Sequence, residues 1–348
     1  MAAKKFAELL PRKAVGGSGD GQPSALSTVL TVSHGGFSMS ITADQAWRYR
    51  FSDTLLLAYQ QMKGLVRGAV DPMMIHYDVM AAIDHHERLG NVMANDVVSP
   101  FAQTIFLNPA HSRRACTLVS SDATVGLSDE NQLRGMVNAS NGYTQTILGA
   151  LNRRGDKHII DALIGSASVA SVTAGSGVIT YGSQAMLSGY QIGAATAMDL
   201  NRIINSTELL SKGGAPNDGG RTFLFSPGQT RDIMAITQAS SSDFTKNQIH
   251  DKGTINGLNW QGFNWVEISD VVDTATTVLS RMLSVPSYRQ CIAFHKSAVG
   301  VSIGKEITTQ IDMRPDLQSR PTQIRASMMM SAVRVFEGGV VEVRALEN

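Results

Sequence analysis

Two observations predict a mixed α+β protein. One is a long amphipathic helix near the middle of the chain, and the other is a strand pattern of alternating apolar and charged residues at its end. In residues 142–167, apolar side chains recur at helical spacing on one face and charged side chains occupy the other. Residues 341–345 alternate apolar with charged side chains, which is the period of a strand with one buried face. Helix and strand signals therefore lie in separate parts of the chain.

The overall composition narrows the classes of function. The 348 residues carry a net charge of +1, which argues against a dedicated nucleic-acid binder because such proteins present a basic surface to phosphates. Charged residues make up 17% of the chain. This fraction is below the roughly 25% of typical soluble domains and favours a chain that covers part of its surface with other chains. No apolar run reaches the roughly 18 residues that span a bilayer, so no membrane partner is expected.

The sequence gives no signal for catalytic, cofactor or metal residues. Cys116 and Cys291 lie far apart and are expected to be buried, reduced thiols. Residues 84–87 (Asp-His-His-Glu) have ligand chemistry, but adjacent side chains diverge and no second group follows at zinc spacing, so a polar turn is expected. His295 and Lys296 lack a nucleophile or carboxylate at a recognisable spacing, so a catalytic pair is not expected.

The first third of the chain is predicted to contain little regular structure. Residues 1–45 combine a basic start with a Gly/Ser-rich run, and they have too little apolar surface to order themselves, which predicts an arm. A helix is predicted over 42–62. Residues 70–118 are long and interrupted by X-Pro turns, which indicates an extended loop with a function of its own.

Further elements follow from local signals. Small, polar residues predict loops, apolar periodicity predicts helices and strands, and Pro227 is placed to open a helix. Gly257 and Gly262 favour tight turns around an aromatic core cluster. The expected elements are a strand over 115–119, an acidic turn over 121–129, a flexible connection over 166–182, a helix over 183–210, a strand over 222–225, a helix over 227–236 and a terminal hairpin that turns at 337–339.

Several of these stretches, in order, resemble the major capsid proteins of tailed bacteriophages. The matching blocks are YQQMKGLVRGAV from Tyr59, LNRRGDKHIIDALIGSA from Leu151, GTINGLNWQGFNWVEIS from Gly253, CIAFHKSAVGVSIGKEI from Cys291 and SAVRVFEGGVVEVRAL from Ser331. The second block is similar to the end of the long spine helix of that family. Ser331 stands where the family often has glycine. In consistent order, the matches extend from about Tyr59 to Leu346, which is most of the chain.

The resemblance implies a Hong-Kong-97-type capsid fold with an N-terminal arm, an extended loop, a peripheral domain that contains the spine helix, and an axial domain. The implied limits are 1–45 for the arm, 46–69 for the helix and first strand of the peripheral domain, 70–118 for the extended loop, 119–182 for the peripheral domain with the spine helix, 183–300 for the axial domain with part of the peripheral domain at its edges, and 301–348 for the return strands of the peripheral domain.

The implied function is that of a major capsid protein and not an enzyme. Such a protein self-assembles into pentamers and hexamers of an icosahedral shell around viral double-stranded DNA, is located in the virion capsid and is assembled in the host cytoplasm. The implied partners are further copies of the chain, a separate scaffolding protein, a portal protein, a decoration protein as a further candidate, and DNA held by non-specific contact. The alternatives are an encapsulin-like nanocompartment shell protein and a soluble enzyme of unrecognised class.

Six charged residues are candidate assembly contacts. Arg113 and Arg114 lie where the chain leaves the extended loop. The other four are expected on the charged face of the spine helix, which faces either a neighbouring subunit or the lumen. These four are Arg153, Arg154, Asp156 and Lys157.

Overall fold

The computed structural model describes residues 61–97, 99–101, 103–128, 140–172, 179–193, 196–236, 253–270, 279, 281–282, 287–318 and 320–347. All of them belong to one compact unit that begins at Ser52. The predicted arm lies outside the described residues. So does the predicted helix over 42–62, except for residues 61 and 62, which are not helical.

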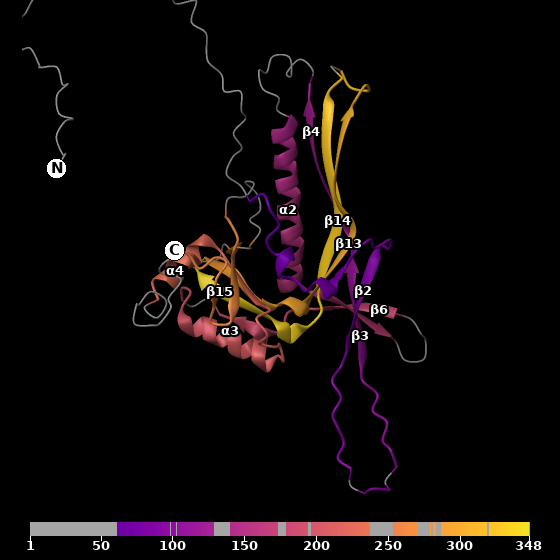
Figure 1. The fold of residues 1–348 in the computed structure, drawn as a ribbon, viewed down its shortest axis with the longest axis vertical. Coiled ribbons are helices and arrows are strands. Elements are labelled where there is room, and N and C mark those ends of the chain that lie inside the picture. The colour runs from indigo at the N-terminus through magenta and orange to yellow at the C-terminus, as the bar shows by residue number, and fades with distance from the viewer. Residues whose placement is uncertain are drawn as a thin grey trace, which may run out of the picture. The chain divides into compact units, whose positions relative to one another are not determined.

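A long helix packed along a four-stranded sheet forms the first part of the fold. The helix is α2 (Ser140–Ile164), so the prediction of a helix over 142–167 is confirmed. In the sheet, the strand order is β1 (Ile75–His76), β13 (Val299–Met313), β14 (Thr322–Arg334) and β4 (Val119–Leu127). Figure 1 shows α2 running beside the long strands β4, β13 and β14. Their apolar faces form one core, since Ile159, Leu163 and Ile324 are fully buried.

Helix α2 is covered over more of its circumference than the sequence pattern predicts. Among its described side chains, only Gln145, Thr146, Arg154 and Asp161 are exposed. The prediction that all charged residues of the spine helix lie on one exposed polar face is therefore wrong. Two of those residues are buried because the chain before the sheet crosses that side of the helix, as described below.

A seven-stranded sheet forms the second part. The strand order is β7 (Gln191–Ile192), β15 (Val340–Leu346), β12 (Tyr288–His295), β8 (Arg221–Phe225), β10 (Phe263–Glu267) and β9 (Asn259–Trp260), with β11 (Arg281–Met282) paired to β12. Strand β12 is buried on both faces: Ile292 and Phe294 join the core of α2, while Cys291 and Ala293 face a second core. This arrangement explains the continuous apolar run of β12.

Two helices belong to this second part, α3 (Leu200–Lys212) and α4 (Pro227–Met234). The predicted strand over 222–225 and helix over 227–236 are confirmed. The helix predicted over 183–210 is wrong in its first half, where the short 3-10 helix η4 (Ser188–Tyr190) and strand β7 stand instead. Helix α3 begins only where the Asp199 side chain accepts a hydrogen bond from the backbone N–H of Arg202, which is an N-cap within the predicted helix.

A second four-stranded sheet has the order β2 (Ile83–Leu89), β3 (His111–Thr117), β5 (Ala167–Val172) and β6 (Ile179–Gln184). The flexible connection predicted over 166–182 is therefore wrong, because most of its described residues pair as strands. Small residues such as Ala167 and Ser168 have low intrinsic preference for strands. Pairing of β5 with β3 offsets this low preference.

Two further predictions are corrected by strand pairing. The acidic turn expected over 121–129 is largely strand β4, whose residues pair with β14 from Val119 to Leu127. The terminal hairpin is also wrong, since β14 and β15 lie in different sheets. The 3-10 helix η6 (Glu337–Gly339) carries the chain from one sheet to the other. A two-residue period predicts a strand, but it does not identify the partner strand.

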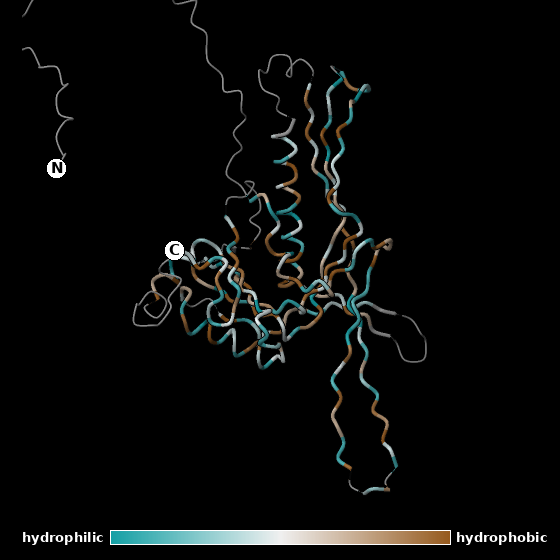
Figure 2. The backbone as a smooth tube through the Cα atoms, viewed as in Figure 1, coloured by the Kyte–Doolittle hydropathy of each residue, from teal (hydrophilic) through white to brown (hydrophobic). Residues whose placement is uncertain are grey.

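The segment between β2 and β3 extends away from the rest of the unit as a long hairpin (Figure 1). Its described residues between 90 and 110 contain no helix or strand. Figure 2 shows that apolar and polar residues are mixed along it. This result fits the prediction of an extended loop within 70–118, although the ends of that range form β1, β2 and β3.

Candidate functional site

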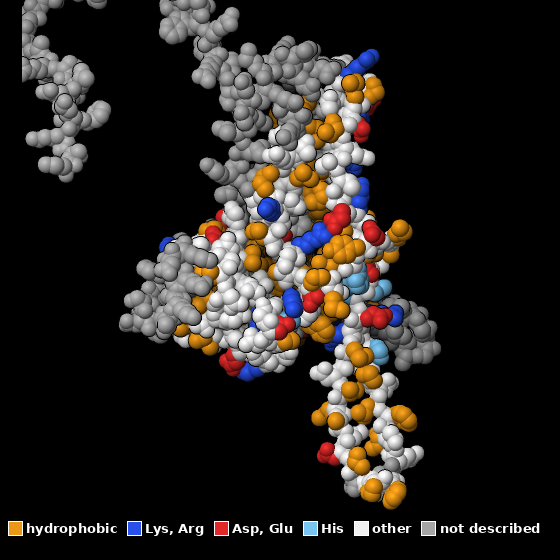
Figure 3. Space-filling view, in the orientation of Figure 1, with side chains coloured by type: hydrophobic (Ala, Val, Ile, Leu, Met, Phe, Trp, Pro, Cys, Tyr) orange, Lys and Arg blue, Asp and Glu red, His pale blue; other side chains and the backbone are white. Residues whose placement is uncertain are grey.

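The extended hairpin, residues 90–110, presents apolar side chains to solvent. Phe101 is 97% exposed and Phe106 is 92% exposed. Figure 3 shows hydrophobic side chains along the hairpin, and Asp96 is the only charged residue between positions 90 and 110. Further exposed apolar residues of this segment are Val92, Met93, Val97, Ile105 and Leu107. Exposed apolar surface of this kind is typical of sites that interact with a protein or a membrane.

The root of the hairpin is held by regular pairing of β2 with β3. The backbone N–H of Gly90 donates to the carbonyl oxygen of Ala110 at 2.7 Å, which closes the ladder. Arg113 and Glu87 form an exposed ion pair across the two strands at 2.8 Å. Arg113 therefore lies at the surface beside the hairpin, where the sequence places a candidate assembly contact.

Arg114 points the other way, into a buried junction. Its side chain lies 3.3 Å from Glu337 and donates to Gln184 at 2.8 Å. Arg334, fully buried, donates to the same Glu337 at 2.6 Å and to the carbonyl oxygen of Leu163 at 2.7 Å. These contacts join β3, the end of α2, β6 and η6. Arg114 thus binds groups inside its own chain.

Asp156 and Arg153 are also buried, and they hold the chain segment that precedes the sheet. Asp156 accepts hydrogen bonds from the backbone N–H groups of Leu65 and Val66 at 2.9 and 3.0 Å. Arg153 donates to the carbonyl oxygen of Gln61 at 3.0 Å. Burial raises the pKa of Asp156, while its backbone hydrogen bonds oppose the rise.

The remaining two spine candidates are accessible to solvent. Arg154 is exposed, and Lys157 pairs with Asp161 one turn further along the helix at 2.9 Å. Arg113, Arg154 and Lys157 therefore stay predictions as assembly contacts. The three buried candidates already have partners within the chain.

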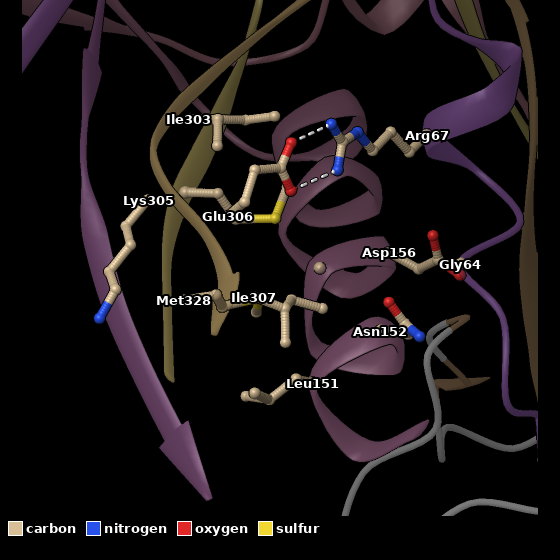
Figure 4. Close-up of a pocket in the computed structure, with 12 residues that line it drawn as sticks. Gly64, Arg67, Leu151, Asn152, Asp156, Ile303, Lys305, Glu306, Ile307 and Met328 are labelled. Carbon is tan, nitrogen blue, oxygen red and sulfur yellow. Dashed lines mark hydrogen bonds and ion pairs between the residues drawn. The ribbon is translucent and has the colours of Figure 1, made fainter. Parts of the chain in front are cut away.

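A pocket lies between α2, the chain at Gly64 and strand β13 (Figure 4). Arg67 closes one side of it through a two-pronged ion pair with Glu306, with one contact at 3.0 Å and one at 2.5 Å. This pairing raises the pKa of Arg67 and lowers the pKa of Glu306. The cavity volume is about 40 Å³, which is room for a few water molecules.

A cluster of polar side chains lies where β1, β2 and β13 meet. Nδ1 of His76 lies 2.6 Å from Oδ2 of Asp84, and Nε2 of His86 lies 3.8 Å from the same oxygen. The hydroxyl of Ser302 donates to that oxygen at 2.7 Å and lies 3.0 Å from Nε2 of His86. Burial is the main cause that lowers the pKa of His86 to about 4.

Sequence reasoning missed this cluster because His76 lies eight residues before Asp84. The expectation that neighbouring side chains at 84–87 diverge is confirmed for the two histidines. His86 is buried, and Gly300 makes room for it, since a Cβ at that glycine would lie 2.5 Å from Nδ1 of the ring. His85 turns to the other side of β2, where its ring stacks on Tyr181.

His295 contacts a hydroxyl and a carboxylate, two partners that the sequence spacing did not reveal. Its Nδ1 lies 2.7 Å from the hydroxyl of Ser297, and its Nε2 lies 3.0 Å from Oδ1 of Asp218. The hydrogen bond with His295 is the main cause that lowers the pKa of Asp218. The backbone N–H of Ser297 also donates to Nδ1, which caps the 3-10 turn η5 (Lys296–Ala298) between β12 and β13. These bonds fix the turn that links the two cores.

The sequence profile of the family described as "Phage capsid protein" matches residues 43–347. The chain belongs to this family of phage capsid proteins, and it is a major capsid protein by fold and by family.

Solved structures show the same fold at low sequence identity. Mycobacterium phage Che8 gives a TM-score of 0.61 at 17% identity, with 86% of this chain and 97% of that chain covered. The capsid of cyanophage P-SCSP1u gives 0.63 at 13% identity, covering 89% and 96%. The head of Helicobacter pylori bacteriophage KHP40 gives 0.63 at 9% identity, covering 86% and 96%. No curated protein matches the chain.

In the described part of the chain, no helix is both long enough and apolar enough to cross a membrane. Both cysteines are buried and unpaired, as the sequence predicts, and burial raises the pKa of each thiol.

Proposed function

We propose that this capsid protein assembles with copies of itself into pentamers and hexamers of an icosahedral shell that encloses double-stranded viral DNA. One observation carries the proposal, namely the extended hairpin with Phe101 and Phe106 almost fully exposed. Burial of a phenylalanine side chain contributes about 1.5–3 kcal/mol, so covering several such side chains favours association strongly.

The geometry of such a contact favours rings. A hairpin that leaves one subunit binds a different surface on the next subunit, which makes the contact heterologous. Heterologous contacts repeat in one direction. They form a closed ring when the rotation from one subunit to the next is a whole-number fraction of 360°. Pentamers and hexamers are closed rings of this type, and one hairpin per subunit serves both.

The net charge of the chain supports contact with packaged DNA that does not recognise the base sequence. A net charge of +1 does not provide the basic surface of a dedicated DNA-binding protein. Contact with packaged DNA is therefore non-specific in this proposal. The protein resides in the virion capsid, and its assembly takes place in the host cytoplasm.

The other partners follow from the family. We propose a separate scaffolding protein, a portal protein and a decoration protein, together with an arm over residues 1–45 that contacts neighbouring subunits. The proposed limits of the remaining parts are 46–69, 70–118, 119–182, 183–300 and 301–348. The protein acts as a structural component and not as an enzyme.

Electron microscopy of the full-length protein tests the proposal. Closed shells built from pentamers and hexamers are the expected result, either from the purified protein or after co-expression with the scaffolding protein of the same phage. A protein that stays monomeric under both conditions contradicts the proposal. Shells that hold cargo protein in place of DNA favour a nanocompartment, which is the alternative function.

A further inference from the structure

We propose that His76, Asp84 and His86 form a binding site for one divalent transition-metal ion at the root of the extended hairpin. The three side chains offer two imidazole nitrogens and a carboxylate oxygen, all within 4.8 Å of one another. This set of donors is typical of zinc sites that keep a further position for water.

The distances fit an ion of this class. Four ligand atoms arranged tetrahedrally at zinc bond lengths of about 2.0–2.1 Å lie roughly 3.3 Å apart. Oδ2 of Asp84 lies 2.6 Å from Nδ1 of His76 and 3.8 Å from Nε2 of His86. These two separations bracket the required value, and the third pair, between the two histidine nitrogens, lies within 4.8 Å and closes when the His76 ring turns.

The carboxylate is held in place by groups that do not ligate the ion. The backbone N–H of His85 donates to Oδ1 of Asp84 at 2.8 Å. The hydroxyl of Ser302 donates to Oδ2 at 2.7 Å, and its 3.0 Å contact with Nε2 of His86 is given up when that nitrogen binds the ion. Hydrogen bonds around the ligands orient them and raise the affinity for the metal.

The two rings differ in their freedom to adapt. They stack with centroids 4.2 Å apart and planes 15° apart, so their lone pairs do not yet converge. The His86 side chain is 2% exposed and keeps its position, whereas the His76 side chain is 40% exposed and has room to turn at the surface. Turning His76 points its nitrogen at the ion and leaves the outer coordination position open to water.

The surroundings do not oppose a cation. The titratable groups that act on the His86 ring are His76, Asp84 and His85, and none carries a permanent positive charge. Each proton that lies between a ligating histidine nitrogen and its acceptor moves to the other nitrogen of the same ring, so both rings bind the ion in their neutral form. Neutral histidine and ionised carboxylate are the forms that bind metals.

The site lies where β1, β2 and β13 meet, and β1 is held to β13 by little pairing. β1 pairs with β13 at only two positions, Ile75 with Val301 and His76 with Ser302. An ion bound by His76 of β1 and by Asp84 and His86 of β2 fixes the hairpin root against this sheet. An effect on shell assembly rests on the proposed function, but binding itself does not.

Titration of the full-length protein with zinc chloride tests the site. Calorimetry is expected to show that each chain binds one zinc ion tightly. Cobalt(II) at the same site is expected to give the visible absorption of tetrahedral coordination. His76→Ala and Asp84→Asn are expected to lose this binding, whereas Ser302→Ala is expected to weaken it about 10- to 100-fold. His85→Ala is the matched control, because this ring faces Tyr181 and keeps out of the cluster.

Three results would overturn the proposal. These are no stoichiometric binding by the unmodified chain, unchanged binding by His76→Ala, and an equal loss in His85→Ala. His76 is half-exposed, so its replacement is expected to preserve the fold, and circular dichroism checks this for each variant. A chain that forms shells without binding zinc refutes the metal site alone, since the shell proposal is read by microscopy.

Discussion

At the scale of single residues, buried polar side chains hold distant parts of the chain together. Asp156 on α2 satisfies backbone N–H groups of the segment around Leu65, which otherwise has no strand partner. Arg334 satisfies carbonyl oxygens at the end of α2. Buried backbone groups require such partners, because burying them unpaired costs free energy.

The first prediction concerns Asp156. Replacement by alanine leaves the N–H groups of Leu65 and Val66 without an acceptor, and each buried unpaired donor costs about 1–3 kcal/mol. We expect the free energy of unfolding in urea to fall by at least about 1 kcal/mol. Asp161→Ala is the control, because Asp161 makes only an exposed pair with Lys157 and its removal is expected to change stability by less than about 0.5 kcal/mol. Equal effects would contradict the assigned role.

The second prediction concerns pH. Burial, followed by the charge of Arg154, lowers the pKa of His158 below its ordinary value of 6.5. The folded state therefore favours the neutral ring, so its contribution is complete above pH 6.5 and is lost as the pH falls below that value. His158→Gln is expected to flatten the decline of the unfolding free energy below pH 6.5. A variant with an unchanged pH profile contradicts this assignment.

At the scale of elements, backbone contacts decide how α3 lies against the rest of the fold. Helix α3 ends at Gly213, whose φ of −72° suits any residue. The reason for glycine there is space, since a Cβ would collide with the backbone of Gly338 in η6. The two glycines let a helix end and a turn touch directly.

The third prediction tests this contact. Gly213→Ala is expected to lower the free energy of unfolding by about 1–3 kcal/mol, because backbone atoms cannot move aside as a flexible side chain does. Gly189→Ala is the control, since a Cβ at Gly189 meets no atom within 4 Å. Thermal unfolding of both variants provides the measurement. A smaller loss in Gly213→Ala than in the control refutes the packing argument.

Elements were predictable where a local signal was complete. The period of α2 and the proline that opens α4 lie within the elements themselves, so both helices are confirmed. β5 and β6 carry weak local signals, and their pairing with each other and with β3 decides their state. The start of α3 was misplaced because the cap of Asp199 lies inside a longer run of apolar residues.

At the scale of the whole molecule, the described part of the chain has apolar surface that it does not bury itself. The hairpin over 90–110 projects from the sheet of β2 and β3 and has little charge. A capsid protein needs such a surface, because its stable state includes its neighbours. The folded subunit and the assembled shell therefore depend on different residues.

The fourth prediction separates these two dependencies. Phe101→Ser combined with Phe106→Ser is expected to leave thermal unfolding of the subunit nearly unchanged, within about 0.5 kcal/mol, because both side chains are exposed. The same change is expected to reduce shell formation seen by electron microscopy. Phe101→Leu with Phe106→Leu is the matched control and is expected to keep assembly. Normal shells from the serine variant would contradict the role of the hairpin.

By itself the sequence determined the α+β class, the spine helix, the turns at Gly257 and Gly262, and a long segment with little regular structure before β3. It did so because each is a property of consecutive residues. Only the tertiary structure decided which strands pair, why Asp156 and Arg114 are buried, and that His76 meets Asp84 and His86. Partners across a sheet depend on contacts between distant residues, and no local period contains that information.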